Sequence, residues 1–234
     1  MKKIRKWTFL AALFVVFGLA PGQAQAGMIT YSLGTAFTGK VDPKSPLTPN
    51  GWLMAAFDDG GGSGSVILTL TSGLGVASEF ISQVDFSVHP AIDPSGLVIT
   101  RTGGTSDGTV SRIIATDQDK QTAGGSHGYD IELHFKKASV NRFDGVGETV
   151  ILTLTGSGLT VEDFDFWNAG KGDSAHVAAH IQGIPTLWPD PEDSTWIKDP
   201  SPVPLPAAAW LLGSGLLGLA VIRRSGGLFK RQGF

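Results

Sequence analysis

The chain has 234 residues and no cysteine. It therefore forms no disulfide, and it has no thiol for catalysis, for zinc or iron–sulfur ligation, or for lipid attachment. Basic residues are scarce in the middle of the chain, where residues 27–202 hold 10 of them against 21 acidic residues, a net charge of −11. A segment this acidic repels a phosphate backbone, so we expect no nucleic-acid partner.

The first 26 residues have the three parts of a secretory signal peptide. Four basic residues precede an apolar run at residues 7–20, and Ala24 and Ala26 form a small-residue cleavage site. We expect the general secretion machinery to export the chain and to leave Gly27 as the new N-terminus. The alternative is an uncleaved membrane anchor, which the shortness of the run disfavours.

A second apolar segment, residues 207–222, contains no charge and is followed directly by an arginine pair. Together with residues 203–206 it reaches the roughly 20 residues that span a bilayer. We expect a transmembrane helix here, with the basic end in the cytoplasm and the body of the protein outside.

This tail resembles the PEP-CTERM sorting signal of Gram-negative bacteria in its VPLPA-type variant. The resemblance rests on the short motif, the apolar helix and the basic pair, in that order, and on these residues: Val203, Pro204, Leu205, Pro206, Ala207, Arg223 and Arg224. It implies recognition by an exosortase, a transient inner-membrane anchor with the body in the periplasm, and later transfer to the cell surface or the extracellular matrix. It also implies a host that makes exopolysaccharide.

Between these ends the sequence predicts short strands. Tyr129, Ile131, Leu133 and Phe135 alternate with polar residues, as a half-buried strand requires. Further strands are predicted at residues 29–37, 52–57, 65–71, 80–88, 97–102, 109–115, 149–155 and 176–184. Gly-rich turns separate them, and no long window repeats at helical period. We therefore predict an all-β fold, a single antiparallel β-sandwich or jelly-roll-like domain over residues 27–188, flanked by the signal helix and the transmembrane helix.

Two segments of this body repeat each other. Residues 65–74 read SVILTLTSGL and residues 149–159 read TVILTLTGSGL. One interpretation is two related halves that pack as facing or adjacent sheets. The alternative is two unrelated strands with the same strand–turn solution.

The composition changes at residue 189, because six prolines occur in the eighteen residues from 189 to 206. Proline at this density favours an extended, semi-rigid chain. We predict a linker over residues 189–202, ahead of the sorting signal at residues 203–234. The last third of the body, through residues 141–143, 179–184 and 194–197, resembles a group of exported PEP-CTERM proteins without an assigned activity, and this resemblance brings no catalytic residues.

Several residue patterns could carry chemistry, each beside a plainer interpretation. Residues 124–128 match the G-x-S-x-G elbow, but a strand rather than a helix is predicted to follow, which favours an ordinary turn. His176 and His180 stand too far apart along a strand, about 13 Å, to share a metal ion. Asp58–Gly62 and Asp117–Asp119 could be calcium loops or ordinary turns.

Sugar recognition is the remaining candidate. Trp188 and Trp196 flank the proline-rich stretch and could stack on sugar rings if exposed. Asp163 and Asp165 could form a hydrolase pair, or a solvated strand face. We expect no catalytic residue, no metal site and no cofactor, with calcium left open. The predicted function is a structural or adhesive component of the exopolysaccharide layer; the alternatives are a carbohydrate-binding module and a secreted glycoside hydrolase.

Overall fold

The computed structural model describes residues 27–39, 42–44, 46–168, 174–186 and 192–200. Within them the alternating segments form thirteen strands and no α-helix. The strands are β1 (Met28–Leu33), β2 (Thr35–Gly39), β3 (Leu53–Asp58), β4 (Ser65–Ser72), β5 (Phe80–Phe86), β6 (Val98–Gly103), β7 (Val110–Ile114), β8 (Gln121–Ala123), β9 (Ser126–Tyr129), β10 (Ile131–Phe135), β11 (Thr149–Thr155), β12 (Val177–Pro185) and β13 (Glu192–Lys198). Two short 3-10 helices, η2 (Pro94–Gly96) and η3 (Val161–Phe164), lie between strands.

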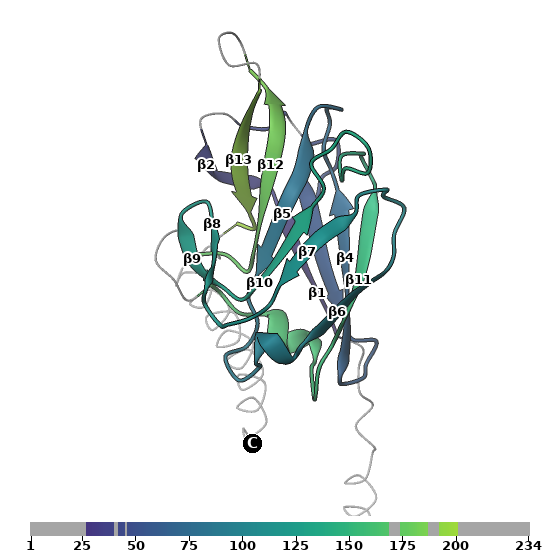
Figure 1. Cartoon of the computed structure of the whole chain (residues 1–234), viewed down its shortest axis with the longest axis vertical. Helices are drawn as coiled ribbons and strands as arrows, with labels where there is room; N and C mark the ends of the chain where they lie inside the picture. The colour runs from purple at the N-terminus through teal and green to yellow at the C-terminus, as the bar shows by residue number, and fades with distance from the viewer. Residues whose placement is uncertain (1–26, 40–41, 45, 169–173, 187–191, 201–234) are drawn as a thin grey trace, which may run out of the picture. The chain divides into compact units, whose positions relative to one another are not determined.

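The strands form two large antiparallel sheets that pack as two layers (Figure 1). Sheet A has the order β1-β3-β4-β11-β6, and sheet B has the order β2-β13-β12-β5-β10-β7. A separate hairpin pairs β8 with β9. The inward side chains of both sheets belong to one buried apolar cluster. The predicted all-β, antiparallel sandwich is therefore confirmed for the described residues.

Aromatic rings join the two layers of the core. Phe57 of β3 stacks on Phe164 of η3 with ring centroids 4.6 Å apart, and it meets Phe86 of β5 at 5.5 Å. Tyr31 of β1 meets the edge of the Phe57 ring at 6.1 Å. Sheet A, sheet B and η3 therefore share one aromatic contact centre.

The first predicted strand, residues 29–37, is two strands in different sheets. The chain leaves sheet A at Leu33 and enters sheet B at Thr35, so only Gly34 separates β1 from β2. The Cβ of any other residue at position 34 would still be 3.8 Å from Gly51 Cα, an ordinary contact. The corner is therefore set by the pairing of β1 with β3 and of β2 with β13, rather than by a special glycine.

The predicted linker over residues 189–202 is wrong in its central part. Residues 192–198 form β13, which pairs with β12 on one side and β2 on the other. Proline cannot donate to a sheet ladder, but the prolines at 189, 191, 200 and 202 all lie outside the strand. Within it Thr195 and Ile197 are buried. The β domain thus extends beyond residue 188 to at least Lys198.

The two repeated segments are neighbouring strands of one sheet. β4 and β11 pair antiparallel, with Leu68 opposite Leu152 at the centre of the register. The interpretation as facing or adjacent sheets is therefore wrong. The repetition places the same residue types on the same face of two paired strands.

Both predicted membrane-directed helices lie outside the described residues. The same holds for Ala24, Ala26 and every residue of the sorting motif from Val203 to Arg224. Among the residues that the structure describes, no helix is both long enough and apolar enough to cross a bilayer.

Candidate interaction surfaces

The outer face of sheet A is built almost entirely from uncharged residues. We define the threonine face as the uncharged outward side chains of its five strands: Met28, Thr30, Ser32, Met54, Ala56, Ser65, Ile67, Thr69, Thr71, Val98, Thr100, Thr102, Thr149, Ile151, Thr153 and Thr155. The alternation of each strand sends its apolar partners into the core, so these residues are half-buried or exposed. Asp58, at the end of β3, is the one acidic outward residue of these strands.

Strand register aligns the threonines into a grid. Thr71 lies opposite Thr149, Thr69 opposite Ile151, and Thr153 opposite Thr100. The hydroxyls of Thr102 and Thr153 are 3.0 Å apart and share a hydrogen bond. Methyl and hydroxyl groups therefore recur about 4.8 Å apart across strands and about 6.7 Å apart along them. A surface of this kind suits a neutral partner that offers both hydroxyl and apolar patches.

The outer face of sheet B is polar and partly covered. Trp196 of β13 stacks flat on His180 of β12, with centroids 4.7 Å apart and planes 8° from parallel. A Cβ at Gly124, in the β8–β9 turn, would lie 2.8 Å from Trp196 Cγ, so the hairpin approaches the same indole. Trp196 is therefore half-buried and ring-stacked within the protein. Trp188 lies outside the described residues, so the predicted Trp188–Trp196 sugar platform stays a prediction.

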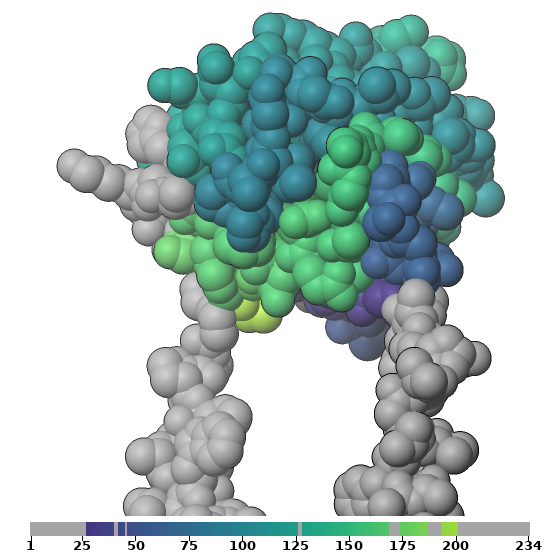
Figure 2. All heavy atoms as spheres, turned by 90° about the horizontal axis from the view of Figure 1, so that it is seen from below, coloured from purple at the N-terminus to yellow at the C-terminus, as the bar shows by residue number. Residues whose placement is uncertain are grey.

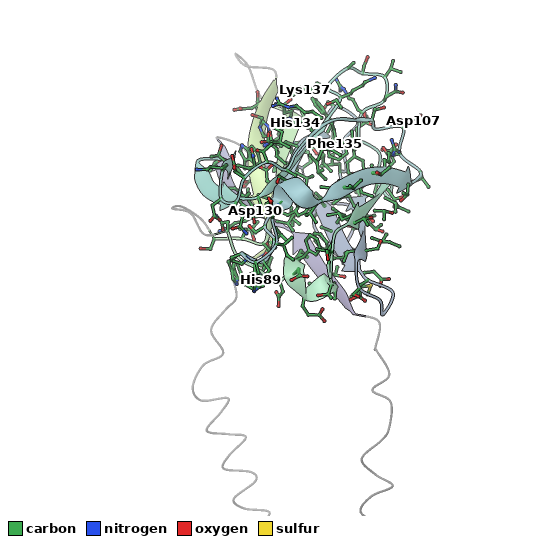
Figure 3. All side chains as sticks on the ribbon, turned by 60° about the horizontal axis from the view of Figure 1, so that its bottom comes forward. His89, Asp107, Asp130, His134, Phe135 and Lys137 are labelled. Carbon is green, nitrogen blue, oxygen red and sulfur yellow. The ribbon has the colours of Figure 1, made fainter. Side chains whose placement is uncertain are left out.

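His180 is a neutral member of this face. Burial, followed by the nearby Lys137 charge, lowers the pKa of His180 to about 4. Its Nδ1 lies 3.1 Å from Ser82 Oγ. Figure 3 shows Lys137 and His134 together at one end of β10, with Asp130 at the other end. His180 is thus a neutral imidazole that is held by hydrogen bonding to Ser82.

A buried carboxyl group lies under the same face. Asp85 of β5 is fully buried, and both of its oxygens accept from Gln83 Nε2 at 3.0 and 3.1 Å. Its cross-strand neighbour is Glu132 of β10, which also contacts His134. Burial raises the pKa of Asp85 well above its ordinary value, and the Glu132 charge adds to the increase. Asp85 and Glu132 are a close carboxyl pair, but the fully buried Asp85 does not reach solvent.

We expect the stability of the protein to fall as the pH rises above about 4, the ordinary pKa of Asp. A carboxyl whose folded pKa is raised contributes stability that is complete below its unfolded pKa and is lost as the pH rises through the folded value. Burial shifts Glu79 and Asp130 in the same direction. In urea unfolding, Asp85→Asn should reduce the decrease of the free energy of unfolding between pH 4 and pH 7. The control is Asp107→Asn, an exposed turn residue (Figure 3); an unchanged slope for Asp85→Asn would contradict the assignment.

A second cluster surrounds His176, just before β12. Its Nδ1 lies 2.9 Å from Asp199 Oδ2 and its Nε2 lies 3.3 Å from Asp165 Oδ1. The imidazole also stacks on Tyr31 at 4.5 Å and meets Trp167 at 3.9 Å. Asp199 Oδ1 accepts the backbone N–H groups of His176 and Val177. This arrangement ties the end of β13 to β12.

Tyr31 completes the His176 cluster as a donor. Its hydroxyl donates to Phe164 O and to Asp165 Oδ1, both at 3.1 Å. Burial, and then the Asp165 carboxylate, raises the pKa of Tyr31, so the phenol keeps its proton. Because a carboxylate lies against each ring nitrogen of His176, we interpret the cluster as a structural contact between β1, β12 and the residues that follow η3 and β13. His176 and His180 contact different residues and do not meet.

The other predicted chemical sites resolve into turns. Gly124 and Gly125, with φ of 55° and 86°, form the turn of the β8–β9 hairpin, so the G-x-S-x-G match spans this turn and the first residues of β9, with a strand and no helix after the turn. This confirms the ordinary turn. Asp58 and Asp59 accept N–H groups of Gly60 and Gly61. No group of three or more His, Asp or Glu side chains that could hold a metal ion occurs among the described residues; calcium stays an open alternative.

Asp163 and Asp165 do not alternate on a strand. Asp163 belongs to η3, where its carboxylate caps the helix by accepting the N–H of Thr160 at 2.9 Å, and Asp165 follows the helix beside His176. The strand expected at these two residues, on which both the hydrolase pair and the solvated face depended, is therefore wrong.

Comparisons with protein-family models, with curated protein sequences and with solved structures gave no match to this chain. The threonine face was missed at the level of sequence. Its signal is present there, because each VILTLT segment puts isoleucine and threonine at alternate positions.

Proposed function

We propose that this is an exported, exosortase-sorted protein whose β-sandwich serves as a structural or adhesive component of the exopolysaccharide layer, without a catalytic role. The signal-peptide pattern and the VPLPA-type tail support export, the signal helix, the membrane anchor and sorting. The observation that carries the adhesive role is the threonine face. It is a broad uncharged surface on a body whose net charge is −11 over residues 27–202.

The charge contrast gives the face its function. A domain with many carboxylates repels anionic neighbours over about a Debye length, roughly 8–10 Å at physiological ionic strength. On the threonine face a polymer can approach without that repulsion, and hydroxyl groups can replace the water that it loses. Many weak contacts along a long polymer add through effective concentration rather than through one tight pocket.

An aromatic carbohydrate platform has less support. The large apolar side chains that are exposed among the described residues are Met28, Leu47, Ile67, Val98, Ile113, Val140 and Val146, and none of them is aromatic. The Phe and Trp rings that are half-buried in the described part of the chain, in Phe37, Phe166, Trp167 and Trp196, each contact another ring or a lysine. A hydroxyl-rich sheet face is the better candidate for contact with polysaccharide.

Charged substitutions on the threonine face should release the protein from the layer. The double variant Thr69→Glu/Thr153→Glu should lower retention on purified host exopolysaccharide by about tenfold, because each side chain is outward and the new charges must be desolvated on contact. Thr69→Lys/Thr153→Lys should lose retention as well, which separates surface complementarity from simple charge attraction. Co-sedimentation measures both. Thr122→Glu on the exposed side of β8 is the matched control.

A separate deletion tests the sorting role. Deletion of residues 207–234 should shift the chain from the cell envelope to the culture medium, as followed by fractionation. Unchanged fractionation would overturn exosortase sorting, whereas unchanged retention of both double variants would overturn the role of the threonine face. Thermal unfolding of each variant shows whether the fold is kept.

A further inference from the structure

Gly27 begins the described chain and is held by Asp59. The backbone nitrogen of Gly27 donates to Asp59 Oδ1 at 3.0 Å, and its carbonyl accepts the backbone N–H of Asp59 at 3.3 Å. The second, a backbone–backbone bond, lies one residue beyond the Met28–Asp58 pair of the β1–β3 ladder, and the first adds the Asp59 side chain to it. In Figure 2 the purple start of the described chain lies against the blue β3–β4 turn and the green η3 region.

The Asp59 carboxylate is fixed by three segments of the chain. Oδ1 also accepts the N–H of Gly61 at 2.8 Å, and Oδ2 accepts the N–H of Val161 at 3.3 Å. These N–H groups hold the pKa of Asp59 below its ordinary value. The carboxylate is therefore a positioned anion that joins the start of β1, the β3–β4 turn and η3.

Position 27 has little room for a side chain. A Cβ there would lie 2.4 Å from Val161 Cγ1, so the Val161 side chain would have to shift to admit any residue larger than glycine. The same Cβ position is 3.4 Å from Glu162 Oε1 and 3.5 Å from Asp59 Oδ2, so two carboxylates surround the residue. Glycine is needed here for space and not for an unusual backbone angle.

We propose that Asp59 and Glu162 form a binding site for the α-ammonium group that signal-peptide cleavage creates on Gly27. This inference rests on the proposed export. In the uncleaved chain the Gly27 nitrogen is an amide with one donor. After cleavage behind Ala26 it is an ammonium with three donors and a positive charge, and its hydrogen bond to Asp59 becomes charge-assisted.

The local charges fit this occupant. The β3–β4 turn with the end of β3, residues 58–64, and η3, residues 161–164, contain four ionisable side chains: Asp58, Asp59, Glu162 and Asp163. All four are acidic, so the new ammonium brings the only cation of these packed segments. Cleavage one residue earlier or later would move the ammonium away from Asp59. Only a chain that starts at Gly27 would therefore place its ammonium group beside Asp59.

The test uses the full chain, exported with its own signal peptide. N-terminal sequencing should find Gly27. Acylation of the α-amine at pH 7 should then be about tenfold slower in the wild type than in Asp59→Asn, because the bound ammonium is held from reaction. Asp58→Asn, which removes a carboxylate that binds only Gly60 N–H, should label like the wild type. Glu162→Gln should accelerate labelling about threefold, and it decides the matter if Asp59→Asn does not fold.

The outcomes separate the two proposals. An N-terminus at Gly27 with equal labelling rates in the wild type, Asp59→Asn and Glu162→Gln would overturn the ammonium site and leave export standing. A chain that keeps Met1, or that begins elsewhere than residue 27, would overturn the predicted cleavage itself.

Discussion

Replacing Phe57 by alanine should lower the free energy of unfolding by about 3–5 kcal/mol, the usual range for a buried Phe→Ala change. Phe57 is 1% exposed and its ring contacts Tyr31, Phe86 and Phe164, which belong to sheet A, sheet B and η3. The vacated volume lies between elements that other contacts hold in place, so it cannot collapse fully. Urea unfolding at constant pH measures the loss.

Two further variants serve as controls for Phe57→Ala. Phe57→Leu keeps much of the apolar volume and should cost clearly less than Phe57→Ala. Val98→Ala on β6 removes a side chain that is 64% exposed, so it should stay within about 0.5 kcal/mol of the wild type. If Phe57→Ala costs no more than Val98→Ala, the aromatic contact centre does not hold the two sheets together.

Gly183→Ala should be the most damaging of the glycine substitutions inside a strand. Gly183 forms the bulge of β12 with φ of 73°, and a Cβ there would lie 2.1 Å from the backbone oxygen of Ser78. Backbone atoms cannot yield as a side chain can. We expect a loss of about 3 kcal/mol or more, from the left-handed conformation and the collision together.

The chain offers a matched control for this substitution. Gly147 has the same φ of 73°, but nothing lies within 4 Å of its Cβ position. Gly147→Ala should therefore cost only the conformational part, about 1–2 kcal/mol. The difference between the two melting temperatures isolates the collision with Ser78. Equal losses would show that β12 can move away from Ser78 without cost.

Alternation in the sequence predicts most of the strands of the sandwich. β3, β4 and β11 fall at the expected residues because each pairs an apolar inward face with a polar or small outward face. The same signal does not show which strands are neighbours. That information comes from long-range pairing, as between β2 and β13, and no local pattern encodes it.

The failures have identifiable causes. The sequence predicts a linker at β13 because prolines flank the segment on both sides. The seven-residue strand between them is buried only by its pairing with β12 and β2, which no local pattern shows. The break at Gly34 was missed because the alternation of residues 29–37 continues through the corner. The Asp85 site could not be expected, since an aspartate in a strand normally marks a solvated face. Asp85 is an exception because the outer face of sheet B is covered at its position.

Pairing between the first and last parts of the domain sets the order in which it can be finished. β2, at residues 35–39, has β13, at residues 192–198, as its neighbour in sheet B. In any process that delivers the chain from its N-terminus, β2 must wait unpaired until some 150 further residues have arrived. Loss of the final strand would leave two ladders open at once, β2 and one side of β12. Sheet B can therefore form completely only from a chain that includes β13, because β2 has no pairing partner until β13 is present.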